Sequence, residues 1–263
     1  MAVTSITPSG TIENTATVML SAKELLSQQM NLAAQNLSNA DTISFKGLIQ
    51  NGMEAVYRNP QLLGLMGKEA IVSYVQGSPI KRRIEQGALK QTHNPFDVAL
   101  NGLGYFVIQS GDQQQLTRDG RFRLNTQGKL VTMDGHSVLG NNGEIDLSGY
   151  RSVSILNDGT ILGFDYNNLQ TVVGSIKCVS VKDEQNDLTY VGQGRFLLSG
   201  EENPMLHDTQ VMQGFLEQSN VNPIMESVRL MQIMERYRES QNVTDMDDQL
   251  KTKTINLRIG SGG

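Results

Sequence analysis

Three histidines are the side chains in this sequence best suited to metal binding or acid–base catalysis. They stand far apart, at His93, His136 and His207, so a metal site or a catalytic triad would form only if folding brought them together. The aspartates within residues 245–248 resemble part of a calcium-binding loop, but the glycine and the final glutamate of such a loop are missing. We therefore expect no metal site and no enzymatic activity from these residues.

Two further features that often indicate chemistry have simpler explanations. The segment Gly102-Leu103-Gly104 lies at the start of a predicted strand, and no helix pattern follows it, so it does not match a phosphate-binding loop. Cys178 is the single cysteine of the chain and cannot form an internal disulfide. We expect it to be a small buried core residue. The sequence thus predicts no cofactor.

The composition indicates a folded protein that does not bind nucleic acid. The chain has 263 residues with a formal net charge of −5, whereas proteins that bind phosphate backbones are usually basic. Aromatic residues make up 5% and tryptophan is absent, so platforms for stacking sugars are scarce. No run reaches the roughly 18 apolar residues of a membrane span. Residues 1–20 lack the basic start and apolar stretch of a secretory signal, so we expect no cleaved signal peptide.

Both ends of the chain show the period of amphipathic helices. From Ala16 to Ala40 there is no glycine or proline, and apolar residues recur at steps of three and four. The same holds from Ile224 to Leu257, where Asn222 and Pro223 form a typical helix start. The predicted stripes contain Met19, Ala22, Leu26, Met30, Ala33, Leu37 and Ala40 at one end, and Ile224, Val228, Met231, Met234, Val243, Met246, Leu250 and Leu257 at the other.

The middle of the chain, roughly residues 85–215, has a different pattern. Turn pairs such as Asp134-Gly135 and Asp158-Gly159 separate short aliphatic and aromatic runs, and no helical period is present. An antiparallel β domain is the structure that this pattern predicts. Alternation at its start should place Phe96, Val98 and Leu100 toward the core, and Asp97 and Asn101 toward solvent.

The terminal helices raise the question of what covers their apolar stripes. Neither helix is stable in isolation, because the entropy lost on ordering it must be offset by packing. Packing the two stripes together would still leave apolar edges for neighbouring copies. Head-to-tail contacts that do not close would then build a filament or tube. The alternative is a monomer whose two helices fold back on the β domain.

Several segments resemble the signatures of the flagellar rod and hook protein family. Residues 35–47 resemble the end of its first helix and the turn that follows, although Ser44 stands where the family usually has glycine. Residues 87–106 resemble the entry into its β domain, and residues 117–122 follow at the expected distance. Residues 214–223 lead into the last helix as they do in the family. Together these segments span nearly the whole chain, and they are specific in combination.

The resemblance implies a structural role at the flagellar basal body. Such proteins are exported unfolded through the flagellar type III export apparatus without signal cleavage, and they join a hollow rod that crosses the periplasm and transmits torque. The implied partners are other rod proteins and copies of the same chain. A short link within residues 138–161 is similar to the proximal-rod branch of the family, because the distal-rod relative usually has a proline-rich stretch there. A distal-rod or hook-type subunit is the first alternative. A secreted β-domain binding module and a cell-wall hydrolase are less favoured.

These observations combine into one expectation for the fold and the site. We expect a mainly β protein with a central antiparallel β domain and long terminal helices that pair as a coiled-coil-like domain. The expected domains are an assembly domain (1–45 with 218–263), an extended connecting segment (46–84) and the central β domain (85–217). The residues expected to carry assembly are Met19, Leu26, Met30, Leu37, Asn39, Phe45, Val221, Asn222, Pro223, Val228, Met231, Met234, Tyr237 and Leu250.

Overall fold

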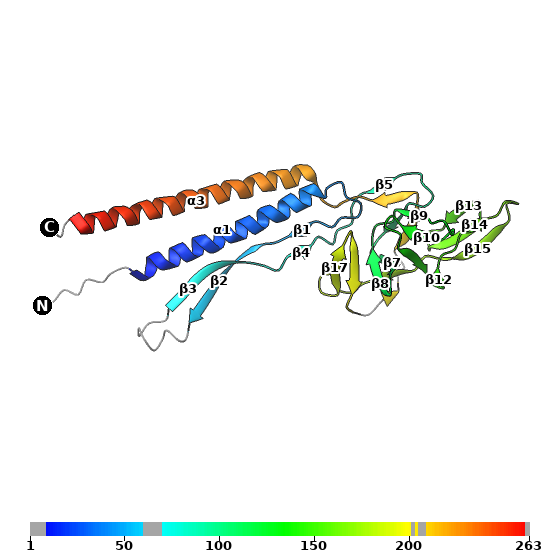
Figure 1. The fold of residues 1–263 in the computed structure, drawn as a ribbon, viewed down its shortest axis with the longest axis horizontal. Helices are drawn as coiled ribbons and strands as arrows, with labels where there is room; N and C mark the ends of the chain where they lie inside the picture. Colours follow the sequence, from blue (N-terminus) through cyan, green and yellow to red (C-terminus); the bar gives the residue numbers. More distant parts are fainter. Residues whose placement is uncertain (1–8, 60–69, 201–202, 205–208, 261–263) are drawn as a thin grey trace. The chain divides into compact units, whose positions relative to one another are not determined.

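The computed structural model describes residues 9–59, 70–200, 203–204 and 209–260, which fall into two compact units (Figure 1). Unit 1 is drawn from residues 1–38, 48–81 and 222–263, and unit 2 from residues 39–47 and 82–221. The chain therefore passes between the units several times. Each unit is described below by itself.

Unit 1 contains two long helices and a β-hairpin. Helix α1 (Ser9–Ser38) contacts both α3 (Pro223–Gly260) and the hairpin formed by β2 (Gly52–Asn59) and β3 (Ala70–Gly77). Figure 1 shows α1 in blue between α3 and the hairpin. The short strand β1 (Leu48–Ile49) pairs with β4 (Lys81–Arg82), where the chain leaves the unit. No helix within the described ranges has the length and apolar character that a membrane crossing needs.

The predicted start of the C-terminal helix is confirmed. Pro223 is its first residue, and the side-chain oxygen of Asn222 accepts hydrogen bonds from the backbone N–H groups of Ile224 (3.0 Å) and Met225 (3.2 Å). Asn222 thereby satisfies N–H groups that have no partner within the helix. The sequence pattern thus predicted the first residue of this helix correctly.

The segment after α1, expected to be extended or irregular, contains the β2–β3 hairpin. The strands pair from Gly52 opposite Gly77 to Asn59 opposite Ala70. A Cβ atom added at Gly52 or at Gly77 would lie 2.7 Å or 2.9 Å from the methyl groups of Leu25. The facing glycines therefore let α1 approach the hairpin closely. Glycine inside a strand often marks such a close approach of another segment.

Unit 2 is an all-antiparallel β structure, as predicted. Its central sheet has the order β17-β18-β8-β7-β11-β10-β9, with β12 paired to β11, β16 to β7 and β19 to β16. A three-stranded sheet β13-β14-β15 and the pairs β20–β6 and β21–β5 complete it. The strands are β5 (Leu89–Gln91), β6 (Val98–Asn101), β7 (Tyr105–Ser110), β8 (Gln113–Thr117), β9 (Phe122–Leu124), β10 (Leu130–Thr132), β11 (Ser137–Gly140), β12 (Gly143–Glu144), β13 (Ser152–Ile155), β14 (Thr160–Phe164), β15 (Gln170–Ser175), β16 (Cys178–Ser180), β17 (Leu188–Gly192), β18 (Arg195–Leu198), β19 (Asn203–Pro204), β20 (Gln210–Gln213) and β21 (Phe215–Glu217).

The core of unit 2 forms around β6 and β7. Phe106 is fully buried and packs edge-on against Phe122, with ring centroids 5.2 Å apart. The half-buried Cys178 packs against the same cluster. The prediction that Asp97 faces solvent was wrong, because Asp97 is buried and accepts a 3.0 Å hydrogen bond from the Asn94 amide. Strand β6 is buried on both faces, so the simple inside–outside alternation does not apply to it.

Candidate functional site

Helix α3 has apolar residues on two sides. Helix α1 covers the side opposite to the predicted apolar stripe. Glu226 and Ile233, seven residues apart on one face, are the buried described residues of this helix. The predicted stripe lies on the other side, and its described members are exposed. They are Ile224, Val228, Met231, Met234, Val243 and Met246, joined by Met225. The expectation that the two predicted stripes pack together was therefore wrong for α3.

The predicted assembly residues of α1 have a different environment, because α1 has partners on two sides. Met19, Leu26, Met30 and Leu37 are half-buried. Leu25, which the predicted stripe omitted, is buried against the β2–β3 hairpin. The helix also ends at Ser38, so its stripe stops short of Ala40.

The remaining predicted residues are divided between the two units. Asn39 and Phe45 are half-buried in unit 2, and Val221 is buried there. Asn222 and Pro223 are exposed at the start of α3, and Tyr237 is half-buried on the side of Ile233. The side chain of Leu250 lies outside the described residues.

A buried polar contact joins α1 to α3. Asn36, fully buried, donates to the Glu226 carboxylate at 2.9 Å. The same amide donates to the carbonyl of Leu48 and accepts from the Leu48 N–H, both at 2.8 Å. Buried amides and carboxylates are costly without such partners. The contact therefore favours one register of the two helices and ties that register to the chain that follows α1.

Unit 2 contains a buried cluster of charged side chains in which the family-like segments meet. Lys46 Nζ lies 2.7 Å from one Glu217 oxygen, and Arg118 lies 3.2 Å from the other. All of these side chains are nearly inaccessible to solvent. The Gly87 N–H donates to the same carboxylate at 3.0 Å. Three of the sequence segments thus each supply one group to a carboxylate that the fourth segment carries.

The charged cluster around Glu217 is closely packed by neighbouring residues. The Arg118 guanidinium also donates to the Gly102 carbonyl at 2.7 Å and lies 5.4 Å from the ring centroid of Tyr105. Burial and the nearby carboxylate of Glu184 raise the pKa of the Tyr105 hydroxyl, which donates to Glu184 at 2.9 Å. A Cβ atom at Gly87 would lie 1.9 Å from the Gln218 carbonyl, so a larger residue does not fit there.

The backbone conformation at Ser44 explains why glycine is usual at this position in the family. Its φ angle is 57°, in the left-handed region that glycine adopts without strain. The serine hydroxyl compensates by donating to the Arg118 carbonyl at 2.7 Å, and its N–H donates to the Glu217 carbonyl at 2.9 Å. The turn therefore keeps the geometry that glycine would allow and anchors it to the buried cluster.

Asn220 ties the segments that lead out of unit 2. Its amide oxygen accepts from the Gly47 N–H at 2.8 Å, and its amide nitrogen donates to the carbonyls of Arg83 (3.1 Å) and Glu85 (2.8 Å). Gly47, Arg83 and Asn220 each lie next to a point where the chain crosses between the units. One side chain thus holds these crossings together at their unit 2 end.

Sequence reasoning missed Lys46, Arg118 and Glu217 because they are far apart along the chain. Lys46 and Glu217 are separated by 171 residues, and nothing local indicates that they meet. A usable signal was present, because each charge stands inside a segment that resembles the family. A lysine, an arginine and a glutamate in such segments are complementary in charge.

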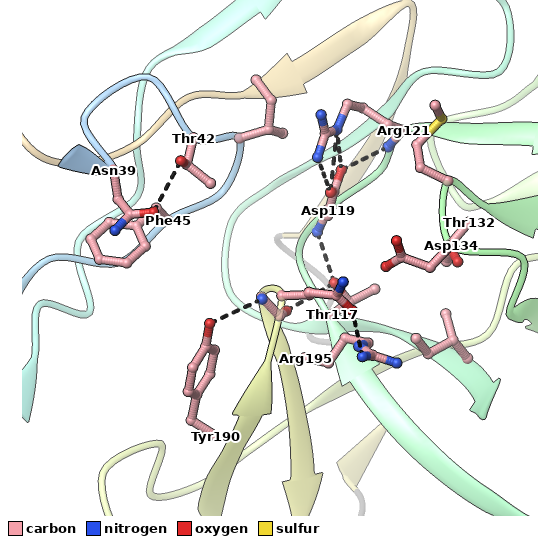
Figure 2. Close-up of a pocket in the computed structure, with 15 residues that line it drawn as sticks. Asn39, Thr42, Phe45, Thr117, Asp119, Arg121, Thr132, Asp134, Tyr190 and Arg195 are labelled. Carbon is pink, nitrogen blue, oxygen red and sulfur yellow. Dashed lines mark hydrogen bonds and ion pairs between the residues drawn. The ribbon is translucent and has the colours of Figure 1, made fainter. Parts of the chain in front are cut away.

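Unit 2 also has a cavity of about 420 Å³, shown in Figure 2. Phe45 and Thr42 line it from the segment after α1, and Tyr190 and Arg195 line it from the β17–β18 hairpin. Arg121 forms a 2.6 Å ion pair with Asp119 in its wall. Within the described residues no cluster of three or more histidine, cysteine or acidic side chains is arranged to hold a metal ion.

Comparisons with known proteins show which family this sequence belongs to. Residues 99–163 match the flagellar hook protein FlgE/F/G D1 domain, and residues 212–257 match the flagellar basal body rod FlgEFG protein C-terminal domain. The chain is 29% identical to the flagellar basal-body rod protein FlgF of Caulobacter vibrioides, over 95% of this chain and 99% of that protein. It is 32% identical to FlgF of Rhizobium meliloti, over 82% and 86%. It is 28% identical to the rod protein FlgG of Agrobacterium fabrum, over 91% and 98%.

A β unit that holds the family's segments around one buried carboxylate, joined to a pair of terminal helices, defines a subunit of the flagellar axial structure. The chain belongs to the family of flagellar basal-body rod proteins and is of the FlgF type. It is a structural subunit of the flagellar rod, and its relatives are structural rod proteins. Membership in this family implies assembly with other rod proteins at the flagellum.

Proposed function

We propose that this rod subunit polymerises through the exposed apolar face of α3, defined by Ile224, Val228, Met231 and Met246, which recur on one side of the helix. All four side chains are exposed, and Met231 keeps 60% of its surface accessible. The exposed side chains of Met225, Met234 and Val243 lie at the flanks of this face. An apolar face of this length on a helix is typical of an interaction site. This is the observation that carries the proposal, because within unit 1 the helix already has its partner on the opposite face.

The spacing on the covered face supports a coiled-coil-like pairing of α1 with α3 inside each subunit. Glu226, Leu230, Ile233 and Tyr237 recur at alternating steps of four and three, and all are buried or half-buried. This is the spacing of a coiled-coil seam. The Asn36–Glu226 hydrogen bond would set the register of that seam, as buried polar pairs do in coiled coils.

The exposed face of α3 would then pack on helices of neighbouring subunits. Methionine is flexible and polarisable, so a methionine-rich face adapts to partners that are related but not identical. We propose that these neighbours are copies of this chain and other rod proteins, arranged as the proximal part of a hollow, torque-transmitting shaft. In this role the protein acts without catalysis or a cofactor.

The same features suit export before assembly. In our proposal the chain passes unfolded through the flagellar type III export apparatus, without signal cleavage, and forms its stable helix contacts at the growing rod in the periplasm. The apolar face of α3 supports this order of events, because it gains its full stabilisation only when neighbours cover it. Helix content measured by circular dichroism should rise when the free chain assembles.

The substitution Met231→Lys tests the proposal. Met231 is mostly exposed in the single chain, so the variant should unfold at the same denaturant concentration as the parent protein. Cells that carry it should lose motility, and purified basal bodies should lack the protein, because a buried ammonium group without a partner disfavours the assembled state. The matched control is Gln241→Lys, an exposed polar position of the same helix outside the apolar set. Normal basal bodies that contain the Met231→Lys protein would overturn the proposal.

A further inference from the structure

The hairpin formed by β14 and β15 presents an exposed apolar tip. Tyr166 is 77% exposed and Leu169 is 66% exposed, and Val172 continues the apolar surface along β15. The turn is held in one shape, since the Asp165 carboxylate accepts hydrogen bonds from the N–H groups of Asn167 (2.7 Å) and Leu169 (2.8 Å). Among the described strands, β15 pairs with β14 on one side only. The tip is therefore a fixed protrusion that the described residues of its own molecule leave largely uncovered.

The cavity of unit 2 has complementary properties. Its volume of about 420 Å³ exceeds the roughly 150 Å³ in which a benzene ring is held in an engineered protein cavity, so an aromatic side chain fits with room for a second group. Phe45, Ile43, Met133 and Tyr190 provide apolar and aromatic walls. None of the residues of the β14–β15 tip lines the cavity, so the chain does not fill it with its own hairpin.

The charged side chains of the cavity and of the hairpin tip also favour contact between them. The Arg121 cation in the cavity wall is paired with Asp119. Arg195, by contrast, contacts His136 (2.5 Å) and Gln193 (2.6 Å), and its Nε atom is buried without a hydrogen-bond partner among the described residues. Asp134 also lines the cavity, but among the described residues it forms no ion pair with Arg195. The hairpin tip carries a single charge, the carboxylate of Asp165. A carboxylate that arrived with the tip would give Arg195 the anionic partner that it lacks.

We propose that the β14–β15 tip of one subunit inserts Tyr166 and Leu169 into the unit 2 cavity of a second copy of this chain. The inference rests on the proposed function, because it supplies a second contact between subunits of the polymer, distinct from the apolar face of α3. Large aromatic side chains that enter a pocket are the usual anchors of protein interfaces. Tyr166 supplies that anchor, and Asp165 places a carboxylate beside the cavity.

The positions of tip and cavity determine the kind of assembly that results. Figure 1 shows the β14–β15 hairpin extending from unit 2 on the side away from β17, which contributes Tyr190 to the cavity wall, while Thr132 and Met133 at the end of β10 line another part of it. A contact between different surfaces of two identical molecules is heterologous, and it propagates from copy to copy unless the rotation between copies closes a ring. A protrusion and a cavity formed by different parts of unit 2 thus suit a subunit that adds along a helical path.

Disulfide cross-linking in purified basal bodies tests the contact. Leu169→Cys places a thiol at the tip, and Gln193→Cys places one on the exposed turn at the cavity. A chain with both changes should form cross-linked dimers and higher oligomers on oxidation, with mass spectrometry identifying a 169–193 peptide pair. Each single variant controls for the native Cys178. The matched control is Leu169→Cys with Asp112→Cys, an exposed turn outside the cavity.

The outcomes separate this contact from the proposed function. Adding Tyr166→Ala to the cross-linking pair should lower the yield of the 169–193 product by about tenfold or more, as loss of an interface anchor does. Basal bodies that contain the chain but give no 169–193 product, or as much of the 169–112 product, would refute the tip-in-cavity contact and leave the rod function intact. Basal bodies that lack the chain altogether would refute both.

Discussion

Glu217 and Lys46 form a buried ion pair across 171 residues of sequence, with 2.7 Å between Nζ and the carboxylate oxygen. Arg118 shares the same carboxylate at 3.2 Å. The carboxylate therefore offsets two buried cations, and we expect the stability of unit 2 to depend on it more than on an exposed pair. This relationship leads to the first prediction.

Replacing Glu217 by glutamine should strongly destabilise the protein. The change keeps the shape of the side chain but leaves the cations of Lys46 and Arg118 buried without a counter-charge. Breaking a buried pair in this way costs about 3–5 kcal/mol. Urea unfolding of the full chain, followed by the fluorescence of its tyrosines, measures the loss.

The exposed pair formed by Lys129 and Glu144 provides the control for that experiment. Both side chains are substantially accessible to solvent, so Glu144→Gln should leave the urea midpoint nearly unchanged. Equal losses for Glu217→Gln and Glu144→Gln would show that the buried cluster has no special role.

Ser44 should tolerate glycine better than alanine. Both variants lose the hydrogen bond to the Arg118 carbonyl, but only alanine keeps the strain of a side chain at a φ angle of 57°. That strain is about 1–2 kcal/mol per residue, so Ser44→Gly should be more stable than Ser44→Ala by about that amount. Thermal unfolding of the two variants side by side decides the point. A more stable alanine variant would contradict the account of this turn.

Asn36 should be essential to the helix contact in unit 1. Asn36→Leu removes three hydrogen bonds and leaves the buried Glu226 carboxylate and the Leu48 backbone without these partners. We expect a loss of about 3 kcal/mol or more, from the cost of unsatisfied buried groups. Hydrogen exchange of the α1 and α3 amides measures it locally. Asn31→Leu, at an exposed position of the same helix, should leave the exchange rates unchanged.

Cys178 should be unreactive in the folded protein. Burial raises the pKa of its thiol to about 12, so at pH 8 nearly all of it is the neutral thiol, which is a poor nucleophile. Iodoacetamide at pH 8 should modify the chain only after denaturation, as mass spectrometry would show. Because the folded-state pKa is raised, reactivity should appear only as the pH rises toward that value. Rapid modification of the native chain at pH 8 would contradict the packing around this residue.

Some of the fold could be predicted from local pattern alone. The C-terminal helix starts where Asn222 and Pro223 indicate, because capping depends on residues that are neighbours in the chain. The hairpin turn at Asp134-Gly135 joins β10 to β11 for the same reason. The direction that α3 faces could not be predicted, since the helix carries apolar residues on two sides and the pattern cannot choose between them.

The candidate site was less accessible to sequence reasoning, because it depends on long-range contacts. The cluster of Lys46, Arg118 and Glu217 forms only when distant segments meet. The contact of Leu25 with Gly52 and Gly77 likewise joins residues that are distant in the sequence. The prediction for Asp97 failed because this residue precedes β6 and bridges to Arg121, where tertiary contacts bury it. The placement of these residues depends on tertiary packing, which has no local signature.

The central claim is that the apolar face of α3 is open in the free subunit and covered in the rod. The direct measurement is the rate at which a maleimide reagent labels Met231→Cys, first in the purified chain and then in purified basal bodies. The account predicts fast labelling of the free chain, where Met231 is 60% exposed, and strong protection in basal bodies. Equal labelling rates in the two states would contradict it.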